Sequence, residues 1–431
     1  MLQIFAARYL LPITAPLIED GALAVEGEKI VAVGSQAELL ARYPEAPLTD
    51  FGAAVLLPPF ANAHTHLELS LYPRWRQHYL GAEAHPTSFV DWILQLIRVK
   101  RQLEPELYRE AITAGIRLSL AAGTGAVGDI LSWWPAQDAH ESSPLLGRLF
   151  FETLGHDPER CRRQLSQISE RLIAGTVGRL SLGISPHAPY TLSRAHLRTT
   201  LEHCRQQSHP WSLHLAESLD EVTFLEESRG ALAERLYPAV GWQDLLPPPA
   251  RRRPFPYLWD QNPGEGGLLV HGVQINAAEI AELAARGNTV VLCPRSNATL
   301  GVGLPPLAAY LQVGVPLAFG TDSLASNKSL SLWDEIAFVA ACYGEAVSPE
   351  TLLQLATQGG AKALGLGETM GALSTGFGAH FQILKPTLLP EKDRLLSFLC
   401  QSGRSAEVTA LYLDGVERLQ NAQTPSIIPA P

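Results

Sequence analysis

Short apolar runs alternate with amphipathic segments through most of this sequence. The runs have the length of strands, and the segments between them place apolar residues on one side of a helix. Eight strands that alternate with helices over roughly 270 residues predict an α/β fold, a (β/α)8 TIM-like barrel. The predicted strands end near His66, Asp129, Glu152, His187, His214, His271, Cys293 and Asp322, and the predicted helices include Pro105–Ala121, Asp157–Ile173, Ser193–Gln207, Ala277–Arg286 and Pro306–Val313.

Both ends of the chain show a different pattern, in which short strands follow one another closely. Strands are predicted at Leu2–Phe5, Ala22–Val25 and Ile30–Val33 near one end and at Phe381–Leu384 and Glu407–Leu413 near the other. We therefore expect both ends to form one small β-sandwich module beside the barrel. The predicted division is residues 1–55 and 371–431 for the module and 56–370 for the barrel, with an insertion at 230–266.

Composition narrows the class of partner. A formal net charge of −10 over 431 residues argues against nucleic acid or an anionic membrane as the main partner. The five cysteines are scattered and include no Cys-x-x-Cys pair, so neither a disulfide framework nor a thiolate zinc site is expected. No secretory signal and no segment long and apolar enough to span a bilayer is recognisable, so we expect a cytoplasmic protein.

A glycine motif between Gly123 and Gly128 spells G-x-G-x-x-G, the spacing of a dinucleotide-binding loop. Such a loop needs a strand before it and a helix after it. Here a predicted helix precedes the glycines, and an apolar run passes through them to Asp129. The motif therefore predicts a strand and not a nucleotide site.

Two histidines, His64 and His66, follow an apolar stretch that is typical of a buried strand. Residues i and i+2 of a strand point to the same face, so the two imidazoles can bind one metal ion. Neutral imidazole is a common zinc ligand. Taken alone, the pair is also compatible with two polar surface residues.

Further polar residues end other predicted strands, and the carboxyl ends of barrel strands meet at one face. His187 ends the fourth strand, His214 the fifth, His271 the sixth and Asp322 the eighth. Each of them alone is compatible with a hydrogen-bonded core residue. Together with the first pair they predict one site at the carboxyl end of the barrel.

The order His-x-His, His, His and Asp on successive strands resembles the amidohydrolase superfamily. Three blocks, Pro186–Thr191, His214–Glu217 and Gly320–Ser323, resemble its branch of chlorohydrolases and nucleoside deaminases. The resemblance covers nearly the whole chain, including the divided β module. It implies a hydrolase that uses a divalent metal ion.

By this resemblance His64, His66, His214 and Asp322 are the ligands of that ion. Three nitrogens and one carboxylate suit zinc (Zn2+) best, with Fe2+ or Mn2+ as alternatives. Two-metal members carry a bridging lysine at the end of the fourth strand. Here His187 stands there, which favours one metal ion per chain.

The resemblance also implies the chemistry of the site. A bound metal lowers the pKa of its water, and Glu217 would take the proton and deliver it to the leaving nitrogen. His271 would stabilise charge as hydroxide attacks, Asp322 would also accept a proton, and His187 would contact substrate. The alternative for Glu217 is an exposed loop carboxylate.

Substrate choice depends on the loops above the metal. The blocks Leu67–Ser70, Ser88–Ile93, Cys293–Asn297 and Thr321–Asn327 together resemble aminodeoxyfutalosine deaminases most closely. Those enzymes release ammonia from an adenine-type nucleoside in menaquinone biosynthesis. The methylthioadenosine/S-adenosylhomocysteine deaminases are also similar, but their ribose-binding glutamate has no counterpart in residues 98–101.

Several alternatives stay open at this stage. The cationic residues Lys100 and Arg101 suit a substrate carboxylate or simple solvation, and Trp92 and Phe89 suit base stacking or helix packing. A hydrolase of C–Cl or C–N bonds on triazine-like rings has the same metal core. A non-catalytic metal-binding scaffold is the alternative of another class, and a homodimer is expected by analogy only.

Overall fold

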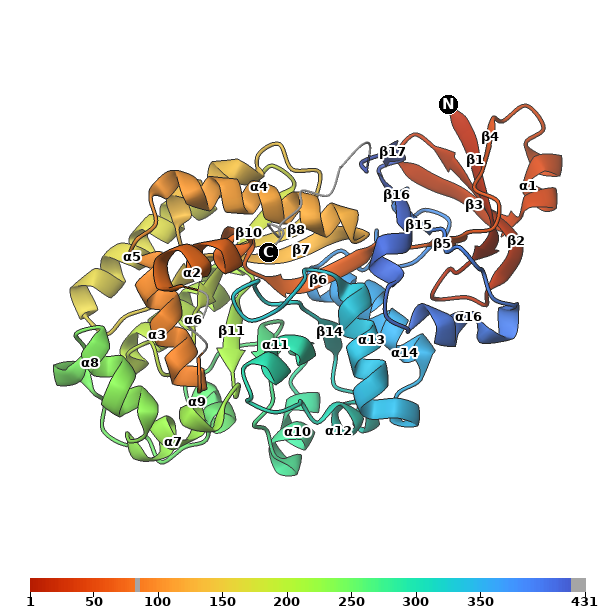
Figure 1. Cartoon of the computed structure of the whole chain (residues 1–431). Coiled ribbons are helices and arrows are strands. Elements are labelled where there is room, and N and C mark those ends of the chain that lie inside the picture. Colours follow the sequence, from red (N-terminus) through yellow and green to blue (C-terminus); the bar gives the residue numbers. More distant parts are fainter. Residues whose placement is uncertain (82–85, 420–431) are drawn as a thin grey trace.

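A ring of eight parallel strands forms the main body of the molecule (Figure 1). The computed structural model describes residues 1–81 and 86–419. Two ladders of parallel strands are joined into the ring by bridges between Ile184 and Trp211 and between Thr65 and Asp322. The strands, in order, are β6 (Phe60–Thr65), β7 (Thr124–Leu131), β8 (Leu146–Thr153), β10 (Leu180–Pro186), β11 (Ser212–Leu215), β12 (Leu268–His271), β13 (Thr289–Leu292) and β14 (Leu317–Phe319).

The ring has the strand order and direction that the alternating pattern predicted. Its strands are buried almost without interruption, as parallel strands covered by helices should be. The glycine motif lies inside β7, directly after helix α4 (Pro105–Ala121), so the prediction of a strand there is confirmed. A short strand, β9 (Thr176–Val177), pairs with β10 in the antiparallel sense.

Two glycines allow the neighbours of β6 to approach its backbone. A Cβ atom on Gly320 would lie 2.9 Å from both Cβ and the carbonyl oxygen of His64. A Cβ atom on Gly128 would lie 2.3 Å from the carbonyl oxygen of Ala63. Only glycine permits these contacts, so the strand that carries His64 is enclosed on both sides at close range.

Helices cover the outside of the ring, and their first turns carry the expected caps. The Asp157 side chain accepts a hydrogen bond from the Arg160 amide, and that of Ser193 accepts one from the His196 amide. The predicted helices agree with the observed ones within a few residues. Besides α4 these outer helices are α5 (Pro158–Leu172), α6 (Arg194–Gln207), α10 (Ala277–Ala284), α11 (Pro294–Thr299), α12 (Leu307–Gln312), α13 (Leu332–Tyr343), α14 (Pro349–Gln354) and α15 (Gly360–Ala363).

Further helical segments follow the carboxyl ends of β6 and β11. Within the described ranges, no helix combines the length and the apolar character needed to cross a bilayer. The segments are α2 (Tyr72–Leu80), α3 (Phe89–Lys100), α7 (Leu219–Glu227), α8 (Tyr237–Ala239) and α9 (Pro254–Trp259). The last two lie in the stretch 230–266 that was predicted as an insertion.

Strands from both ends of the chain form one further sheet, which lies to one side of the barrel (Figure 1). Its order is β17-β16-β15-β5-β1-β2-β3, with β4 paired to β1. The N-terminal strands are β1 (Leu2–Leu10), β2 (Ile18–Glu26), β3 (Lys29–Ser35), β4 (Leu48–Asp50) and β5 (Val55–Leu57), and the C-terminal ones are β15 (Phe381–Leu384), β16 (Val408–Leu413) and β17 (Val416–Glu417).

This sheet corrects one part of the fold prediction. A module built from both ends is present, but its strands join in one continuous sheet and not in the two sheets of a β-sandwich. The reason is the position of β5, which pairs with β1 on one side and with β15 on the other. Helices α1 (Gln36–Arg42) and α16 (Lys392–Leu399) accompany it. Residues 420–431 of the predicted C-terminal part lie outside the described residues.

Candidate active site

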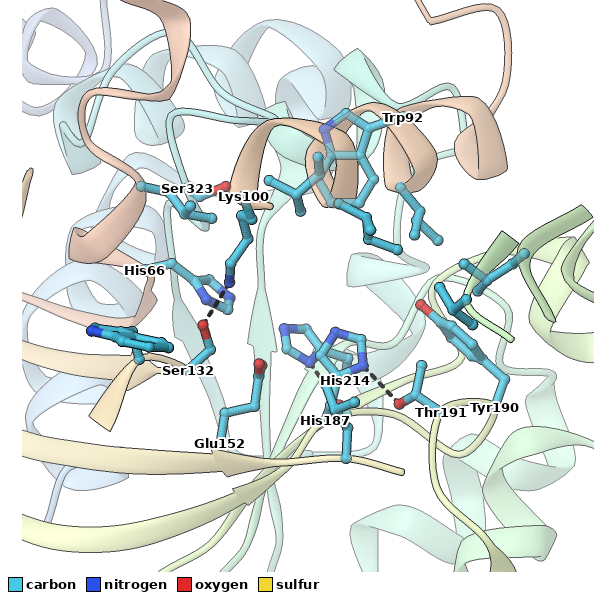
Figure 2. A pocket seen from close by; sticks show the side chains of 18 of the residues that line it. His66, Trp92, Lys100, Ser132, Glu152, His187, Tyr190, Thr191, His214 and Ser323 are labelled. Carbon is cyan, nitrogen blue, oxygen red and sulfur yellow. Dashed lines mark hydrogen bonds between the residues drawn. The ribbon is translucent and has the colours of Figure 1, made fainter. Parts of the chain in front are cut away.

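A cavity of about 580 Å³ opens at the carboxyl ends of the barrel strands (Figure 2). All the residues predicted for the site except His64 line it, and His64 lies directly beneath them. Most of its remaining wall is apolar or aromatic. The predicted site residues in its lining are His66, Trp92, His187, His214, Glu217, His271 and Asp322.

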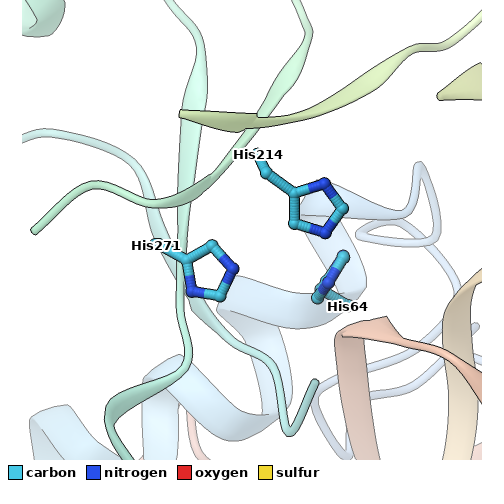
Figure 3. Close-up of side chains that lie close together, drawn as sticks. All are labelled: His64, His214 and His271. Carbon is cyan, nitrogen blue, oxygen red and sulfur yellow. The ribbon is translucent and has the colours of Figure 1, made fainter. Parts of the chain in front are cut away.

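The four predicted metal ligands converge at the floor of this cavity. His64 Nε2 lies 3.7 Å and His66 Nε2 lies 3.6 Å from Asp322 Oδ1. The ring centroids of His64 and His214 are 4.9 Å apart. Figure 3 shows His271 beside these two rings, and one nitrogen of each of the three histidines lies within 4.8 Å of the others. The structure therefore places a fifth group, His271, at the cluster.

The cluster fits a metal ion on a direct structural criterion. Both ring nitrogens of His64 are buried and have no hydrogen-bond partner among the described residues. An unpaired buried polar atom is costly, and a cation bound to the ring removes that cost. Burial holds the pKa of His66 well below its usual value, so its imidazole is neutral and has a free lone pair for a metal.

Hydrogen bonds fix the direction of two further rings. His214 Nδ1 lies 2.7 Å from the carbonyl oxygen of His187, which can only accept, so Nδ1 donates and Nε2 is free to bind a metal. His271 Nδ1 lies 2.8 Å from Oδ1 of Asn297. Burial lowers the pKa of His271 to about 4, and it lowers that of His187 to about 4 as well.

Asp322 is held by two serine hydroxyls. Ser296 Oγ and Ser326 Oγ donate to its Oδ2 at 2.7 and 2.8 Å, which leaves Oδ1 for the histidines. Burial alone would raise the pKa of Asp322, but its close contacts with the rings of His64 and His66 hold that pKa well below its usual value. This carboxyl is therefore ionised beside the imidazoles.

Backbone strain accompanies the convergence at three strand ends. Ala216, His271 and Asp322 have φ angles of 54°, 77° and 57°, in the left-handed region that non-glycine residues seldom adopt. Backbone amides of Thr321 and Asp322 donate to the carbonyl oxygen of His64 at 3.1 Å and hold this conformation. Strain of this kind persists only where the surrounding structure enforces it, and it is concentrated at functional sites.

Glu217 is buried, and this excludes the alternative of an exposed loop carboxylate. Only 4% of the residue is accessible to solvent, and its Oε1 lies 3.6 Å from His271 Nε2. Burial raises the pKa of Glu217 well above its usual value, and the neighbouring charges of Asp322 and Glu221 raise it further. The Glu217 amide donates to Glu221 Oε2 at 2.9 Å, which fixes the turn after His214.

Helix α3 covers the cavity and brings Trp92 to its wall (Figure 2). The indole nitrogen of Trp92 donates to the carbonyl oxygen of Ala325 at 2.9 Å, and its ring stacks on Phe89 at 5.9 Å. Trp92 thus both packs and lines the cavity, whereas Phe89 is a packing residue. Helix packing therefore accounts for Phe89, whereas Trp92 is also placed to contact a ligand in the cavity.

A partly buried ion pair that the sequence did not predict forms another part of the wall. Lys100 Nζ lies 3.1 Å from Glu68 Oε1, and Glu68 is fully buried. Glu68 also accepts from the backbone amides of Ser132 and Trp133 at 3.1 and 3.0 Å. Lys100 is therefore paired within the protein, and simple solvation of this lysine is excluded.

Glu152, at the end of β8, was recognised only as a strand end. Its Oε1 is buried without a hydrogen-bond partner, and burial raises its pKa to about 7. The signals that could have found Ser296, Asn297 and Ser326 were in the blocks after β13 and β14, where small polar residues follow the strand ends. No comparable local signal marked Glu68 or Lys100.

A (β/α)8 barrel whose strand ends gather four histidines and an aspartate around one cavity has the arrangement expected of a metal-dependent enzyme. The chain belongs to the amidohydrolase family, whose profile matches residues 55–417. Residues 21–46 match an imidazolonepropionase-like composite domain of bacteria. The resemblance inferred from the motifs is thereby confirmed.

Three similar proteins, all deaminases, show which members of the family this chain resembles. The aminodeoxyfutalosine deaminase of Deinococcus radiodurans is 32% identical over 80% of this chain and 81% of its own length. The 5-methylthioadenosine/S-adenosylhomocysteine deaminase of Nitratidesulfovibrio vulgaris is 29% identical over 93% of this chain and 88% of its own. The crystal structure of a zinc-containing adenosine deaminase from Xanthomonas campestris has a TM-score of 0.75 at 26% identity, covering 97% of this chain and 92% of that one.

The chain is therefore a hydrolase that acts on carbon–nitrogen bonds, an aminohydrolase like these relatives. The buried histidine cluster, together with the zinc-containing neighbour, supports a divalent metal ion at the floor of the cavity.

Proposed function

We propose that this protein deaminates an adenine-type nucleoside by metal-dependent hydrolysis and that its substrate is aminodeoxyfutalosine, on the route to menaquinone. The observation that carries the proposal is the convergence of His64, His66, His214 and Asp322 beneath a buried Glu217. The relatives of known activity support the nucleoside. Methylthioadenosine or S-adenosylhomocysteine is the second candidate substrate.

His64, His66, His214 and Asp322 would hold one zinc ion in this proposal. When bound, the ion supplies a water that is acidic enough to act as a nucleophile at neutral pH. The neutral imidazoles and the ionised carboxyl described above suit a dication of this kind. The serine hydroxyls on Asp322 and the carbonyl on His214 keep the ligands in place.

Glu217 is the general base and then the general acid. It takes a proton from the attacking water while the water oxygen bonds to the amino-bearing ring carbon and the electron pair of the ring C=N bond moves to the ring nitrogen. Glu217 gives this proton to the amino nitrogen as the exocyclic carbon–nitrogen bond breaks and the ring carbonyl forms, and the second water proton passes through Asp322 to the ring nitrogen. One water is consumed and one ammonia leaves. The burial that raises the pKa of Glu217 suits a group that holds and releases a proton near neutrality.

His271 and Asp322 assist this transfer. His271 lies 3.6 Å from Glu217, and Asn297 fixes its ring, so it can stabilise charge that develops on the attacking oxygen. Asp322 is the second proton acceptor. His187 and Trp92 contact the substrate from the cavity wall, and the apolar lining around them excludes bulk water.

One feature favours aminodeoxyfutalosine over methylthioadenosine. Arg101 and Arg160 line the outer part of the cavity, and neither forms a salt bridge with any described residue. A substrate that carries a carboxylate away from its base would bind there, since an unpaired guanidinium at a cavity mouth favours an anion. Methylthioadenosine carries no such group.

The test is metal analysis followed by ammonia release from adenosine, aminodeoxyfutalosine, methylthioadenosine, S-adenosylhomocysteine and a chlorinated triazine. We expect about one zinc ion per chain and the highest kcat/KM with aminodeoxyfutalosine. Full metal occupancy without release of ammonia from any nucleoside would overturn the proposal of a deaminase. Chloride release from the triazine would favour the alternative hydrolase, and an inactive metal-loaded protein would favour the scaffold.

The same proposal includes the division of the chain into residues 1–55 and 371–431 around a barrel at 56–370, with the insertion 230–266 contributing to the cavity. Leu236, Val240 and Trp242 of that insertion line the cavity, which supports a role in substrate choice. The homodimer stays a prediction.

A further inference from the structure

An unpaired carboxyl lines the cavity at the end of β8, two strands away from the strand that precedes Glu217. Glu152 is 8% exposed, and no donor of the described chain bonds its Oε1. Figure 2 shows its side chain rising from the strand floor between Ser132 and His187. A carboxyl in such a position gains free energy from any ligand that brings hydrogen-bond donors.

The neighbouring histidine presents a second acceptor. Thr191 Oγ1 donates its only hydrogen to the carbonyl oxygen of Ala188 at 3.0 Å. His187 Nδ1, 2.9 Å from the same Oγ1, must therefore be the donor in that contact. The other nitrogen of the neutral ring, Nε2, is then an acceptor, so Glu152 and His187 together require a ligand with donors.

The cations near this acceptor pair are already engaged. Lys100 bonds to Glu68 and Ser132, and no salt bridge within 4.0 Å links it to Glu152. The Trp134 indole nitrogen donates to the backbone carbonyl of Glu152 and not to its side chain. Within the described residues, the protein thus leaves the donors for Glu152 to be supplied from the cavity.

In the ring of strands, β10 separates the strand of Glu152 from the one that precedes Glu217. Glu152 ends β8 and His187 follows β10, whereas Glu217 follows β11 and contacts His271 after β12. A nucleoside whose base reaches Glu217 and His271 can extend its sugar toward β8 and β10, since both strands end in the same cavity. The exposed arginines Arg101 and Arg160 line the same cavity.

We propose that Glu152, beside His187, accepts hydrogen bonds from the hydroxyl groups of the substrate's sugar and so selects nucleosides with intact ribose hydroxyls. This inference rests on the proposed deaminase function and names a specificity residue for it. A carboxylate suits the task because two adjacent hydroxyls present two donors to its two oxygens.

A metal ion is the competing occupant, because one ligand atom each of Glu152, His187 and His214 lie within 4.8 Å of one another. The hydrogen bonds argue against it. His214 is oriented by a carbonyl toward the histidine cluster below, and the two remaining groups are too few for a closed site. Metal content of the variants decides between the two occupants.

The experiment compares kcat and KM for adenosine, 2′-deoxyadenosine and 3′-deoxyadenosine in the wild-type protein, Glu152→Gln and Glu152→Asp. Glu141→Gln, at an exposed carboxyl outside the cavity, is the matched control. In the wild-type protein, loss of a hydroxyl should reduce kcat/KM by about 10- to 100-fold, mainly through KM. In Glu152→Gln the kcat/KM for adenosine should fall by a similar factor. The two deoxynucleosides should then have about the same kcat/KM as adenosine.

Glu152→Asp should recover part of the preference for hydroxyls, and the control should match the wild-type protein. Zinc content and Tm should stay the same in all variants. An equal hydroxyl preference in the wild-type protein and Glu152→Gln would overturn this inference alone. Loss of metal from Glu152→Gln would replace the proposed sugar contact by a metal-ligand role. Absence of deamination by the wild-type protein with every nucleoside, aminodeoxyfutalosine included, would overturn the proposed function itself.

Discussion

The floor and the wall of the cavity are built in different ways. The floor consists of side chains at strand ends, held by the barrel backbone and by hydrogen bonds from residues that follow neighbouring strands, such as those of Ser296 and Ser326 to Asp322. The wall depends on a long-range ion pair, Glu68 with Lys100, which joins the loop after β6 to the end of α3. The floor is thus a property of the fold, whereas the wall is a property of particular loops. Chemistry and selectivity should therefore respond separately to substitution.

The largest effect is expected at Glu217. Glu217→Gln keeps the shape of the side chain but removes its proton transfer, so kcat should fall by about 10³-fold or more. Zinc content should be unchanged, as measured by metal analysis, because Glu217 is not among the four proposed ligands. Retention of turnover within tenfold would show that this carboxyl does not move the proton.

The second prediction tests whether the floor depends on its serine supports. Asp322→Ala should lose both metal and activity. Ser296→Ala should retain activity at saturating zinc but bind zinc about 10- to 100-fold more weakly, because supporting hydrogen bonds orient a ligand. Zinc titration of the metal-free protein measures this, with Ser329→Ala, a serine outside the ligand cluster, as control. Equal zinc affinity in Ser296→Ala and the control would show that the Ser296 hydrogen bond to Asp322 does not contribute to zinc binding.

The third prediction concerns the ion pair between Glu68 and Lys100 in the cavity wall. Glu68→Gln leaves Lys100 without its anion and should lower the free energy of unfolding by about 1–3 kcal/mol. KM should rise while zinc content stays constant, since the metal ligands are untouched. Denaturant unfolding and steady-state kinetics provide the two readouts. Combining it with Lys100→Gln should restore part of the lost stability, and a double variant less stable than Glu68→Gln would contradict the pairing.

The smallest effect is expected at the cavity mouth. Arg160→Gln should raise KM for a carboxylate-bearing nucleoside by a few-fold to about tenfold and leave adenosine unaffected, because an exposed charge contributes little. Arg163→Gln is the matched control on the same helix turn, outside the main cavity. An equal change for both substrates would remove the argument for an anionic substituent.

The sequence predicted the floor because its signals are local. His64 and His66 are two residues apart on a strand, and every other ligand directly follows an apolar run, so strand order alone brings them together. The pairing of Glu68 with Lys100 joins residues 32 positions apart across a turn and two helices, and no periodicity encodes it. The continuous terminal sheet was not predicted for a similar reason. It depends on the pairing of β5 with β1 and β15, which are far apart in the sequence.

That position of β5 has a consequence for the order of synthesis. On the ribosome, residues 55–57 can pair with β1 at once, but their other edge stays open until residues 381–384 emerge, more than three hundred residues later. Only Pro58 and Pro59 separate β5 from the strand that carries His64, and Gln382 donates to the Pro58 carbonyl at 3.0 Å. The strand that carries His64 is therefore among the earliest parts made and among the last to be secured, which leaves a nascent chain exposed to edge pairing with its neighbours.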